Sequence, residues 1–228
     1  MTLRAAWDDE AGDWIRFSGE ADVFAWRFNL PAFLELIPPP GSLTLDIGCG
    51  EGRVARILMG RGHTVKGIDG SAALVEAARR GDPPVDAVTA DAADLPLAEA
   101  SADLVVSFMT LQSVDDLDGA LAEAGRVLVG GGQLCIAIVH PMNTGAGAES
   151  YFEPQHLPYV HEREGVRIVL HDMHRPLSAY FEALGKAGFV TEVVREPVPG
   201  PPLLDIRPEA AKWTRTPCFL HLRAAKHS

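Results

Sequence analysis

The sequence predicts an α/β fold in which a mainly parallel sheet carries helices on both faces. Short apolar runs typical of buried strands alternate along the chain with longer amphipathic stretches typical of helices. This alternation implies crossover connections, which produce a parallel sheet. A chain of 228 residues, of which 47% are apolar and 22% charged, is large enough for one globular domain with a sizeable core.

The expected elements follow one another through the middle of the chain. Buried strands are predicted over residues 43–47, 64–68, 86–89, 103–108 and 133–139. Helices are predicted between them, over residues 53–61, 71–80 and 116–128. Ser71 is a good N-cap for the second helix. The glycines at 130, 131 and 132 are expected to form the turn that ends the third helix.

The most informative motif is the glycine-rich turn after the first strand. Residues 43–52 read Leu-Thr-Leu-Asp-Ile-Gly-Cys-Gly-Glu-Gly. The glycines allow a tight bend and let a ligand approach the main chain, while the following helix offers free N–H groups at its start. The spacing is G-x-G-x-G, whereas a dinucleotide loop usually reads G-x-G-x-x-G. Asp46 just before the turn would repel a pyrophosphate, so the motif favours a cationic nucleotide-like ligand.

Leu45 to Gly52 resembles the first motif of the class I S-adenosylmethionine-dependent methyltransferases. The resemblance is to the small-molecule branch related to the ubiquinone/menaquinone biosynthesis methyltransferases, of the methyltransferase domain 11 type. Four further segments match in order, at residues 63–71, 90–92, 94–109 and 126–134. The resemblance implies a Rossmann-like, doubly wound, seven-stranded and mostly parallel sheet whose last strand is antiparallel. It also implies S-adenosyl-L-methionine as the cofactor, a helix over 177–187, and strands over 189–196 and 217–225.

The resemblance also assigns residues to the cofactor. Asp69 lies 19 residues beyond Gly50 (69 − 50), where an acid accepts hydrogen bonds from the ribose hydroxyls. An acid at Asp91 faces the adenine amino group in the family, although Asp94 competes for this role and helix capping is an alternative. The predicted cofactor-binding residues are Asp46, Gly48, Cys49, Gly50, Asp69, Gly70, Asp91, Ala92, Phe108 and Met109. Packing alone would explain the last two equally well.

Two segments flank this core. Residues 1–40 are predicted to form an N-terminal helical cap, and residues 41–228 the methyltransferase domain with a lid insertion at about 140–176. Within the insertion, residues 158–173 are expected to form a hairpin. Ligands of open α/β sheets bind outside the carboxyl ends of the strands, so both segments are expected near the substrate. Candidate lid or substrate residues are Trp14, Phe17, Asp22, Phe24, Trp26, Tyr151 and His174, with ordinary helix packing as the alternative for those of the cap.

His140 follows the fifth strand and is a candidate catalytic base, because an imidazole can take a proton near neutral pH. The alternative is a histidine that hydrogen-bonds a loop. The histidines at 156, 161, 171 and 174 match no zinc-ligand spacing, and His171 and His174 would lie on opposite faces of a strand. No metal is therefore predicted. Cys49 is expected to fill space rather than act as a nucleophile.

Charge and composition limit the partners. The net charge is −11, from 20 basic and 31 acidic residues, and no basic cluster occurs, which disfavours nucleic-acid substrates. No apolar run reaches ~18 residues, so no membrane span is expected. The N-terminus lacks the apolar region of a signal peptide, and three cysteines cannot all pair. A cytoplasmic monomer or homodimer is therefore predicted.

The predicted function is methyl transfer by direct displacement to an oxygen, nitrogen or carbon atom of a small molecule. The aromatic residues of 1–40 and 140–176 favour an acceptor that is partly aromatic or apolar. One alternative is a nicotinamide-dependent oxidoreductase on a Rossmann-like fold, against which Asp46 and the loop spacing argue. The other is a non-catalytic S-adenosylmethionine-binding protein, because methyl transfer requires no particular side chain.

Overall fold

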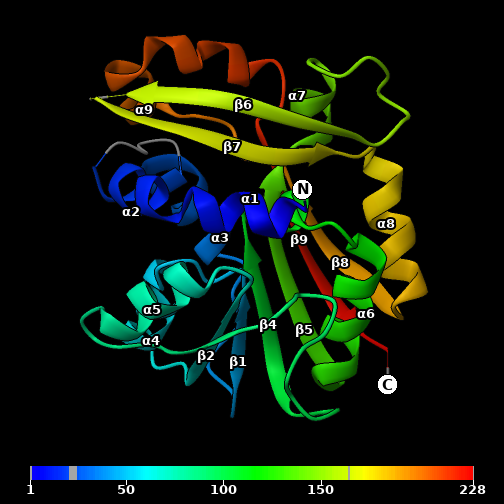
Figure 1. The fold of residues 1–228 in the computed structure, drawn as a ribbon. Helices are drawn as coiled ribbons and strands as arrows, with labels where there is room; N and C mark the ends of the chain where they lie inside the picture. The colour runs from blue at the N-terminus through cyan, green and yellow to red at the C-terminus, as the bar shows by residue number, and fades with distance from the viewer. Residues whose placement is uncertain (1, 21–24, 164, 228) are drawn as a thin grey trace.

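The structure of the protein, a computed structural model, describes residues 2–20, 25–163 and 165–227. Asp22 and Phe24, two of the candidate lid residues, lie outside these ranges. The predicted α/β architecture is confirmed: Figure 1 shows a central sheet flanked by helices, with a separate two-stranded hairpin at one end.

The central sheet has seven strands in the order β3-β2-β1-β4-β5-β9-β8. The strands are β1 (Thr44–Ile47), β2 (Val65–Asp69), β3 (Asp86–Thr89), β4 (Ala102–Phe108), β5 (Leu128–Val139), β8 (Phe189–Arg195) and β9 (Phe219–Lys226). Strands β3, β2, β1, β4 and β5 pair in parallel, whereas β9 pairs antiparallel with both β5 and β8. The predicted antiparallel last strand is therefore confirmed, and the parallel strand ends converge on one edge.

Helices cover both faces of the sheet, and each face has its own apolar core. The helices α3 (Leu30–Leu34), α4 (Arg53–Gly60) and α5 (Ala72–Arg80) bury Phe33, Leu58 and Val75 against one face. The helices α6 (Leu117–Val127) and α8 (Leu177–Lys186) bury Leu121 and Leu184 against the other. Each fully buried side chain of this size contributes about 1.5–3 kcal/mol, so both cores hold the site-bearing strand ends in place.

The glycines at 130, 131 and 132 do not form the turn that was predicted to end the third helix. Helix α6 ends at Val127, and strand β5 begins at the next residue and runs through all three glycines. The pairing with β4 shifts there, from Ala102 opposite Leu128 to Leu104 opposite Gln133. A side chain at Gly132 would lie 3.0 Å from the Leu128 side chain. The glycines therefore permit an irregularity within a strand.

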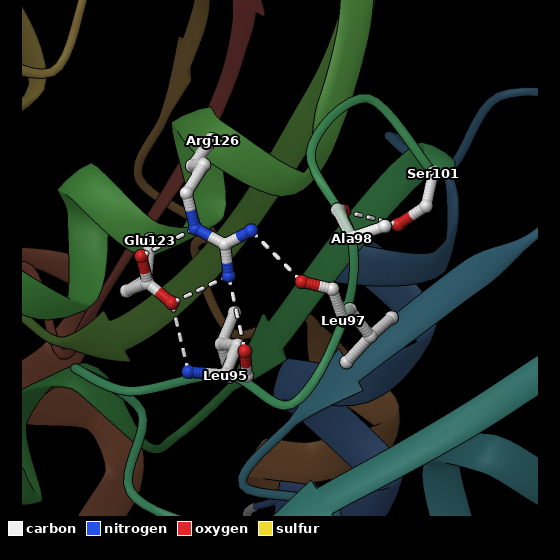
Figure 2. A network of polar contacts seen from close by, with 6 residues as sticks. All are labelled: Leu95, Leu97, Ala98, Ser101, Glu123 and Arg126. Atoms are coloured by element: carbon white, nitrogen blue, oxygen red, sulfur yellow. Dashed lines mark hydrogen bonds and ion pairs between the residues drawn. The ribbon is translucent and has the colours of Figure 1, made fainter.

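A loop on the way to β4 is clamped by the helix behind it. Arg126 of α6 donates to the carbonyls of Leu97 and Leu95, at 2.8 and 3.0 Å, and also pairs with Glu123. Glu123 in turn accepts from the Leu95 N–H at 2.8 Å, as Figure 2 shows. The ion pair lowers the pKa of Glu123, which keeps the carboxylate charged. Because this loop directly follows Asp91 and Ala92, the clamp fixes their position.

The N-terminal helices and a hairpin together cover the carboxyl edge of the sheet. Helices α1 (Leu3–Asp9) and α2 (Ala11–Glu20) precede a short π-helical turn, η1 (Ala25–Asn29). After β5 come α7 (Pro141–Gly145) and the hairpin of β6 (Gln155–Arg163) and β7 (Val166–His174), which is longer than predicted. Glu10 accepts from the Val169 N–H at 3.2 Å, so the two segments meet, and Figure 1 shows α1 and α2 beneath the hairpin.

The hairpin places alternate residues on opposite faces. Ile168, Leu170 and Asp172 of β7 lie on the face toward the body of the protein, where Ile168 packs on Phe17. Tyr159 and His161 lie opposite Leu170 and Ile168 across the ladder and share this face. The hairpin therefore presents both apolar and ionisable side chains to the space above the sheet.

The segment between β8 and β9 adds a further wall. It contains α9 (Pro201–Ile206) and the 3₁₀ helix η3 (Pro208–Thr214). Leu203 and Ala210 from these elements pack with Phe28 and Phe219, so this segment is anchored beside the start of β9. Over the described ranges, no helix combines the length and apolar character needed to cross a membrane.

Candidate functional site

A cavity of about 680 Å³ lies above the carboxyl ends of the parallel strands. The sheet contributes the glycine loop and the ends of β1, β2 and β4, and the N-terminal helices, the hairpin and η3 contribute the remaining walls. Nine of the ten predicted cofactor-binding residues line this cavity: Gly48, Cys49, Gly50, Asp69, Gly70, Asp91, Ala92, Phe108 and Met109. The tenth, Asp46, is 1% exposed and lies behind the loop.

The glycine loop has the left-handed backbone that glycine favours. Gly48, Gly50 and Gly52 have φ angles of +75°, +54° and +86°. A side chain at Gly48 would overlap Thr110, so the end of β1 and the segment after β4 can approach each other only because this position is glycine. At Gly50 the nearest side-chain atom to a Cβ would be Trp14 Nε1 at 3.6 Å. The main chain at Gly50 is therefore open to a ligand.

Asp69 fixes this loop from the end of β2. Its Oδ2 accepts a hydrogen bond from the Gly50 N–H at 2.8 Å, and its Oδ1 accepts from the Ser71 N–H at 2.9 Å. Burial raises the pKa of Asp69, and the two hydrogen bonds oppose that rise. Each oxygen has a second lone pair, so the carboxylate can also receive hydroxyl groups of a ligand.

Asp46 is a buried acid with an unmet hydrogen-bonding capacity. Burial, together with the negative charges of Asp69 and Glu51, raises the pKa of Asp46 to about 7. Its Oδ2 has no hydrogen-bond partner among the described residues. Three carboxylates thus act on one another around the glycine loop, an arrangement that repels phosphate groups and attracts a cation.

Asp91 and Ala92 line the cavity on the loop that the Glu123–Arg126 pair clamps. Asp91 Oδ1 accepts from the Ala93 N–H at 2.9 Å, which is a local turn contact. No helix begins here, so Asp91 is not a helix cap; it forms a local turn and also borders the cavity.

Met109 has a left-handed backbone at the end of β4, with φ +60°, which is unusual for a residue with a side chain. Its N–H donates to Ala137 O at 2.7 Å, and Gln112 Nε2 donates to its carbonyl at 2.8 Å. Asn29 Nδ2 lies 3.1 Å from the Met109 sulfur, and Asn29 Oδ1 lies 2.5 Å from Nε2 of buried His221. This chain of contacts fixes Met109 on the cavity wall.

The donor and acceptor roles in this series of contacts follow from the protonation state of His221. Burial lowers the pKa of His221 to about 4, so the ring is neutral near pH 7. Its Nε2 must then carry the proton and donate to Asn29 Oδ1, which turns the Asn29 amide donor toward Met109. Sequence analysis missed Asn29 and His221, because they lie 192 positions apart.

The three described aromatic residues proposed for the cap, Trp14, Phe17 and Trp26, all line the cavity. Trp14 Nε1 donates to Glu51 Oε2 at 3.3 Å, so the cap is attached to the glycine loop. Trp26 stacks on Phe108 with ring centroids 6.1 Å apart, and the Arg53 guanidinium lies 4.3 Å from the Trp26 ring centroid.

Tyr151 and His174 are not brought to the cavity. His174 is fully buried, with Nδ1 2.8 Å from Thr144 Oγ1 and Nε2 3.0 Å from the Tyr151 carbonyl oxygen. The Tyr151 hydroxyl accepts from the Leu177 N–H at 3.2 Å. Together these contacts attach α7 to the base of the hairpin, so Tyr151 and His174 hold these two segments together.

His140 does not line the cavity, although Val139 next to it and Cys218, whose carbonyl accepts the His140 N–H, do. It is 2% exposed and caps α7, with Nδ1 accepting from the Met142 N–H at 3.1 Å. Nε2 lies 3.0 Å from Glu196 Oε1. Burial lowers the pKa of His140 while Glu196 raises it. These contacts match the loop-binding alternative, and the role of His140 as a base stays a prediction.

Several cavity residues were not found by sequence analysis. They are Arg4, Trp7, Glu51, Arg53, Ser113, Asp115, Tyr159, His161, Asp172, Arg207, Glu209, Lys212 and Trp213. Most lie on segments outside the recognised motifs. In the described part of the chain, no group of three or more His, Cys, Asp or Glu side chains is arranged to hold a metal ion. Cys49, Cys135 and Cys218 are buried and form no disulfide, and burial raises the pKa of Cys49.

Comparison with known proteins agrees with this geometry. Residues 45–136 match a family described as a methyltransferase domain. The nocamycin O-methyltransferase of Saccharothrix syringae is 30% identical over 198 residues, which cover 77% of this chain and 70% of that protein. The chain belongs to the S-adenosylmethionine-dependent methyltransferases.

A further relative matches a shorter part of this methyltransferase, and a solved structure matches most of its fold. A probable S-adenosylmethionine-dependent methyltransferase of Mycobacterium tuberculosis is 31% identical over 112 residues, covering 49% of this chain and 41% of that protein. The aligned segment thus spans less than half of this relative. A putative S-adenosylmethionine-dependent methyltransferase of Listeria monocytogenes has the same fold, with a TM-score of 0.74 at 24% identity over 87% of this chain and 96% of that one.

The residues of the methyltransferase fit S-adenosylmethionine, which carries an ammonium and a sulfonium group and no phosphate. The left-handed main chain at Gly50 is open to a ligand, and the carboxylates of Asp46, Glu51 and Asp69 interact around it. Arg53, one of the cations next to this loop, is paired with Glu51 at 3.0 Å. The glycine loop is therefore suited to a cation and unsuited to the pyrophosphate of a nicotinamide dinucleotide.

Proposed function

We propose that the protein transfers a methyl group from S-adenosylmethionine to a small-molecule acceptor by direct displacement. The observation that carries this proposal is the glycine loop, held by Asp69 and surrounded by carboxylates, at the floor of a roofed cavity. When bound, S-adenosylmethionine supplies an electrophilic methyl group on a sulfonium that is a good leaving group. The protein's task is therefore mainly to orient two molecules and exclude water.

The residues of the cavity divide this task. Gly50, Asp69 and Asp91 would hold the cofactor, with Phe108 and Met109 at its methionine end. The N-terminal cap and the hairpin would act as the lid, excluding water and enclosing the acceptor. Alignment of two reactants alone can supply roughly 7–11 kcal/mol of a barrier. Trp7, Trp14 and Tyr159 on the cavity wall support an acceptor that is partly aromatic or apolar.

The named relative that covers most of this chain is an O-methyltransferase, which supports oxygen as the acceptor atom. The absence of a disulfide among Cys49, Cys135 and Cys218 supports a reducing, cytoplasmic location. A monomer or homodimer stays a prediction.

Calorimetry with S-adenosylmethionine and S-adenosylhomocysteine tests the proposal. Both ligands should bind the protein, and Asp69→Ala should weaken each by about tenfold or more, because it removes an acceptor and frees the Gly50 N–H. Gly50→Arg should abolish binding by placing a cationic side chain where the ligand meets the main chain.

The matched control is Asp118→Ala, which removes an exposed acid paired with Lys186 on a helix away from the cavity. This variant should bind both ligands like the unmodified protein. Absence of binding to the unmodified protein would overturn the proposed function. Binding without transfer to any acceptor in a labelled-methyl screen would instead favour a non-catalytic binding protein.

A further inference from the structure

Asp172 is a buried carboxylate on the hairpin that also borders the cavity. It is 5% exposed and lines the cavity from β7, one strand of the hairpin that Figure 1 shows beyond the end of the central sheet. Its Oδ1 accepts from Ser113 Oγ at 2.9 Å. Its Oδ2 accepts no hydrogen bond from the described residues, so one oxygen is left for a ligand.

Asp69 and Asp103 are better satisfied than Asp172, and Asp46, which also has an unpartnered oxygen, does not line the cavity. Asp69 accepts two main-chain N–H groups, and Asp103 accepts from the N–H groups of Ser42 and Leu43 as well as the Ser42 hydroxyl. Asp172 has a single hydroxyl donor and forms no ion pair with any described residue. A buried charge with so few partners is costly to the fold, which indicates a role other than stability.

The surroundings hold Asp172 in place. Ser113 ends the short 3₁₀ helix η2 (Leu111–Ser113), directly after the end of β4. Arg175 donates to the carbonyls of Leu111, Val114 and Asp115, at 3.3, 2.6 and 3.2 Å. These bonds fix η2 to the base of the hairpin, and they occupy the guanidinium with main-chain oxygens. Ser113 and Asp172 therefore form a rigid pair beside Met109 and Thr110, at the edge of the predicted cofactor site.

Taking the proposed function as given, we propose that Asp172 is a catalytic residue that receives the proton of a hydroxyl acceptor of the phenol or enol type. The free Oδ2 would accept a hydrogen bond from the acceptor O–H, with Ser113 steadying the other oxygen. Apolar walls formed by Val114 and Leu170 next to this carboxylate suit the ring or chain that carries such a hydroxyl.

The proposed step balances in atoms and charge. The acceptor O–H bond breaks and its proton goes to Asp172 Oδ2; the oxygen forms a bond to the methyl carbon, and the sulfur keeps the electron pair of the broken S–C bond. One carboxylate and one sulfonium charge disappear together, which is favourable in a cavity of low polarity. Burial raises the pKa of Asp172 to about 6, so the group is ionised at neutral pH and basic enough to accept the proton of an acidic hydroxyl.

The test uses phenol and anisole, which differ by the hydroxyl hydrogen that Asp172 would receive. The complex with S-adenosylhomocysteine is titrated with each probe and followed by ligand-observed NMR. The unmodified protein should bind phenol more tightly than anisole. Asp172→Asn should weaken phenol binding by about tenfold, leave anisole binding unchanged, and leave the S-adenosylhomocysteine affinity unchanged. Asp118→Asn, at an exposed site, should change none of these values.

Three results would overturn the proposal. Phenol could fail to bind in preference to anisole, or the preference could be the same in Asp172→Asn. Asp172→Asn could also weaken S-adenosylmethionine but not S-adenosylhomocysteine, which would place the carboxylate against the sulfonium. Failure of the unmodified protein to bind S-adenosylhomocysteine would instead be a failure of the proposed function itself, so the two can be distinguished.

Discussion

The floor and the roof of the cavity are built in different ways. The floor is formed by the glycine loop after β1 and by the end of β2, with left-handed Gly48 and Gly50 and with the Asp69 carboxylate, which accepts two main-chain N–H groups. The roof is made of side chains from three segments that are far apart in sequence, the N-terminal helices, the hairpin and η3. This difference suggests that the floor determines which cofactor fits and the roof which acceptor fits. It also predicts that the two parts respond differently to substitution.

Adding a methyl group to the floor at Gly48 should have the largest effect. Gly48→Ala places a Cβ in the Thr110 side chain at a left-handed position, so we expect a loss of about 3–5 kcal/mol of unfolding free energy. Gly131→Ala is the matched control, because its φ is +73° and its Cβ would meet nothing within 4 Å. That variant should lose only about 1 kcal/mol. Equal losses in urea denaturation would contradict a close approach at Gly48.

The buried acid of the floor should make stability depend on pH. The pKa of Asp46 is about 7 in the folded protein and near 3.8 when exposed, so the folded state binds the extra proton between these values. Unfolding free energy should therefore fall by about 2–4 kcal/mol as the pH rises from 4 to 7, and then level off for this group.

Asp46→Asn should remove most of that slope and stabilise the protein at pH 8. Urea denaturation of both proteins between pH 5 and pH 8 measures the difference. Burial also raises the pKa of Asp69 and, to about 6, that of Asp172, so a slope of the same sign should persist in the variant. An unchanged slope would show that Asp46 is not the group that titrates.

Loss of the clamp behind the floor should have a moderate effect. Arg126→Ala frees two carbonyls and Glu123, and we expect a loss of about 1–2 kcal/mol of stability and a severalfold weaker affinity for S-adenosylhomocysteine. Lys186→Ala is the control, because it removes an exposed ion pair with Asp118 between the helices α8 and α6 and does not touch the loop that Arg126 holds. Normal affinity of Arg126→Ala for S-adenosylhomocysteine would show that cofactor binding does not depend on the hydrogen bonds from Arg126 to the loop after Asp91.

The smallest effect is expected in the roof. Trp14→Phe keeps the ring but loses the hydrogen bond to Glu51, so the unfolding free energy should fall by about 1 kcal/mol or less. Affinity for S-adenosylhomocysteine should change by less than about threefold if the floor alone sets it. A larger loss in calorimetry would show that the cap takes part in cofactor binding and would weaken the distinction between floor and roof.

The floor could be predicted from sequence because it depends on local patterns. Gly48, Gly50 and Asp69 lie in short segments that carry the family resemblance, and each segment follows a predicted strand. The roof could not, because its residues meet only after the chain has folded. An aromatic or histidine in the insertion has an even chance of either face, and Tyr151 and His174 pack away from the cavity while Asp172 borders it. The turn predicted at 130–132 was wrong for a related reason, because glycines occur both in turns and at irregular positions within strands.

The position of β9 has a consequence for the order in which the molecule can be made. This strand lies between β5 and β8, yet it is synthesised after both of them. While a ribosome is still translating the chain, β5 has only β4 beside it, and its other edge carries unpaired N–H and C=O groups. Only when residues 219–226 have emerged can β8 join the sheet and His221 reach Asn29. The cavity wall at Met109 is thus completed only by the last strand, β9. Until β9 has formed, the nascent chain exposes the edge of β5 to mispairing and to chaperones.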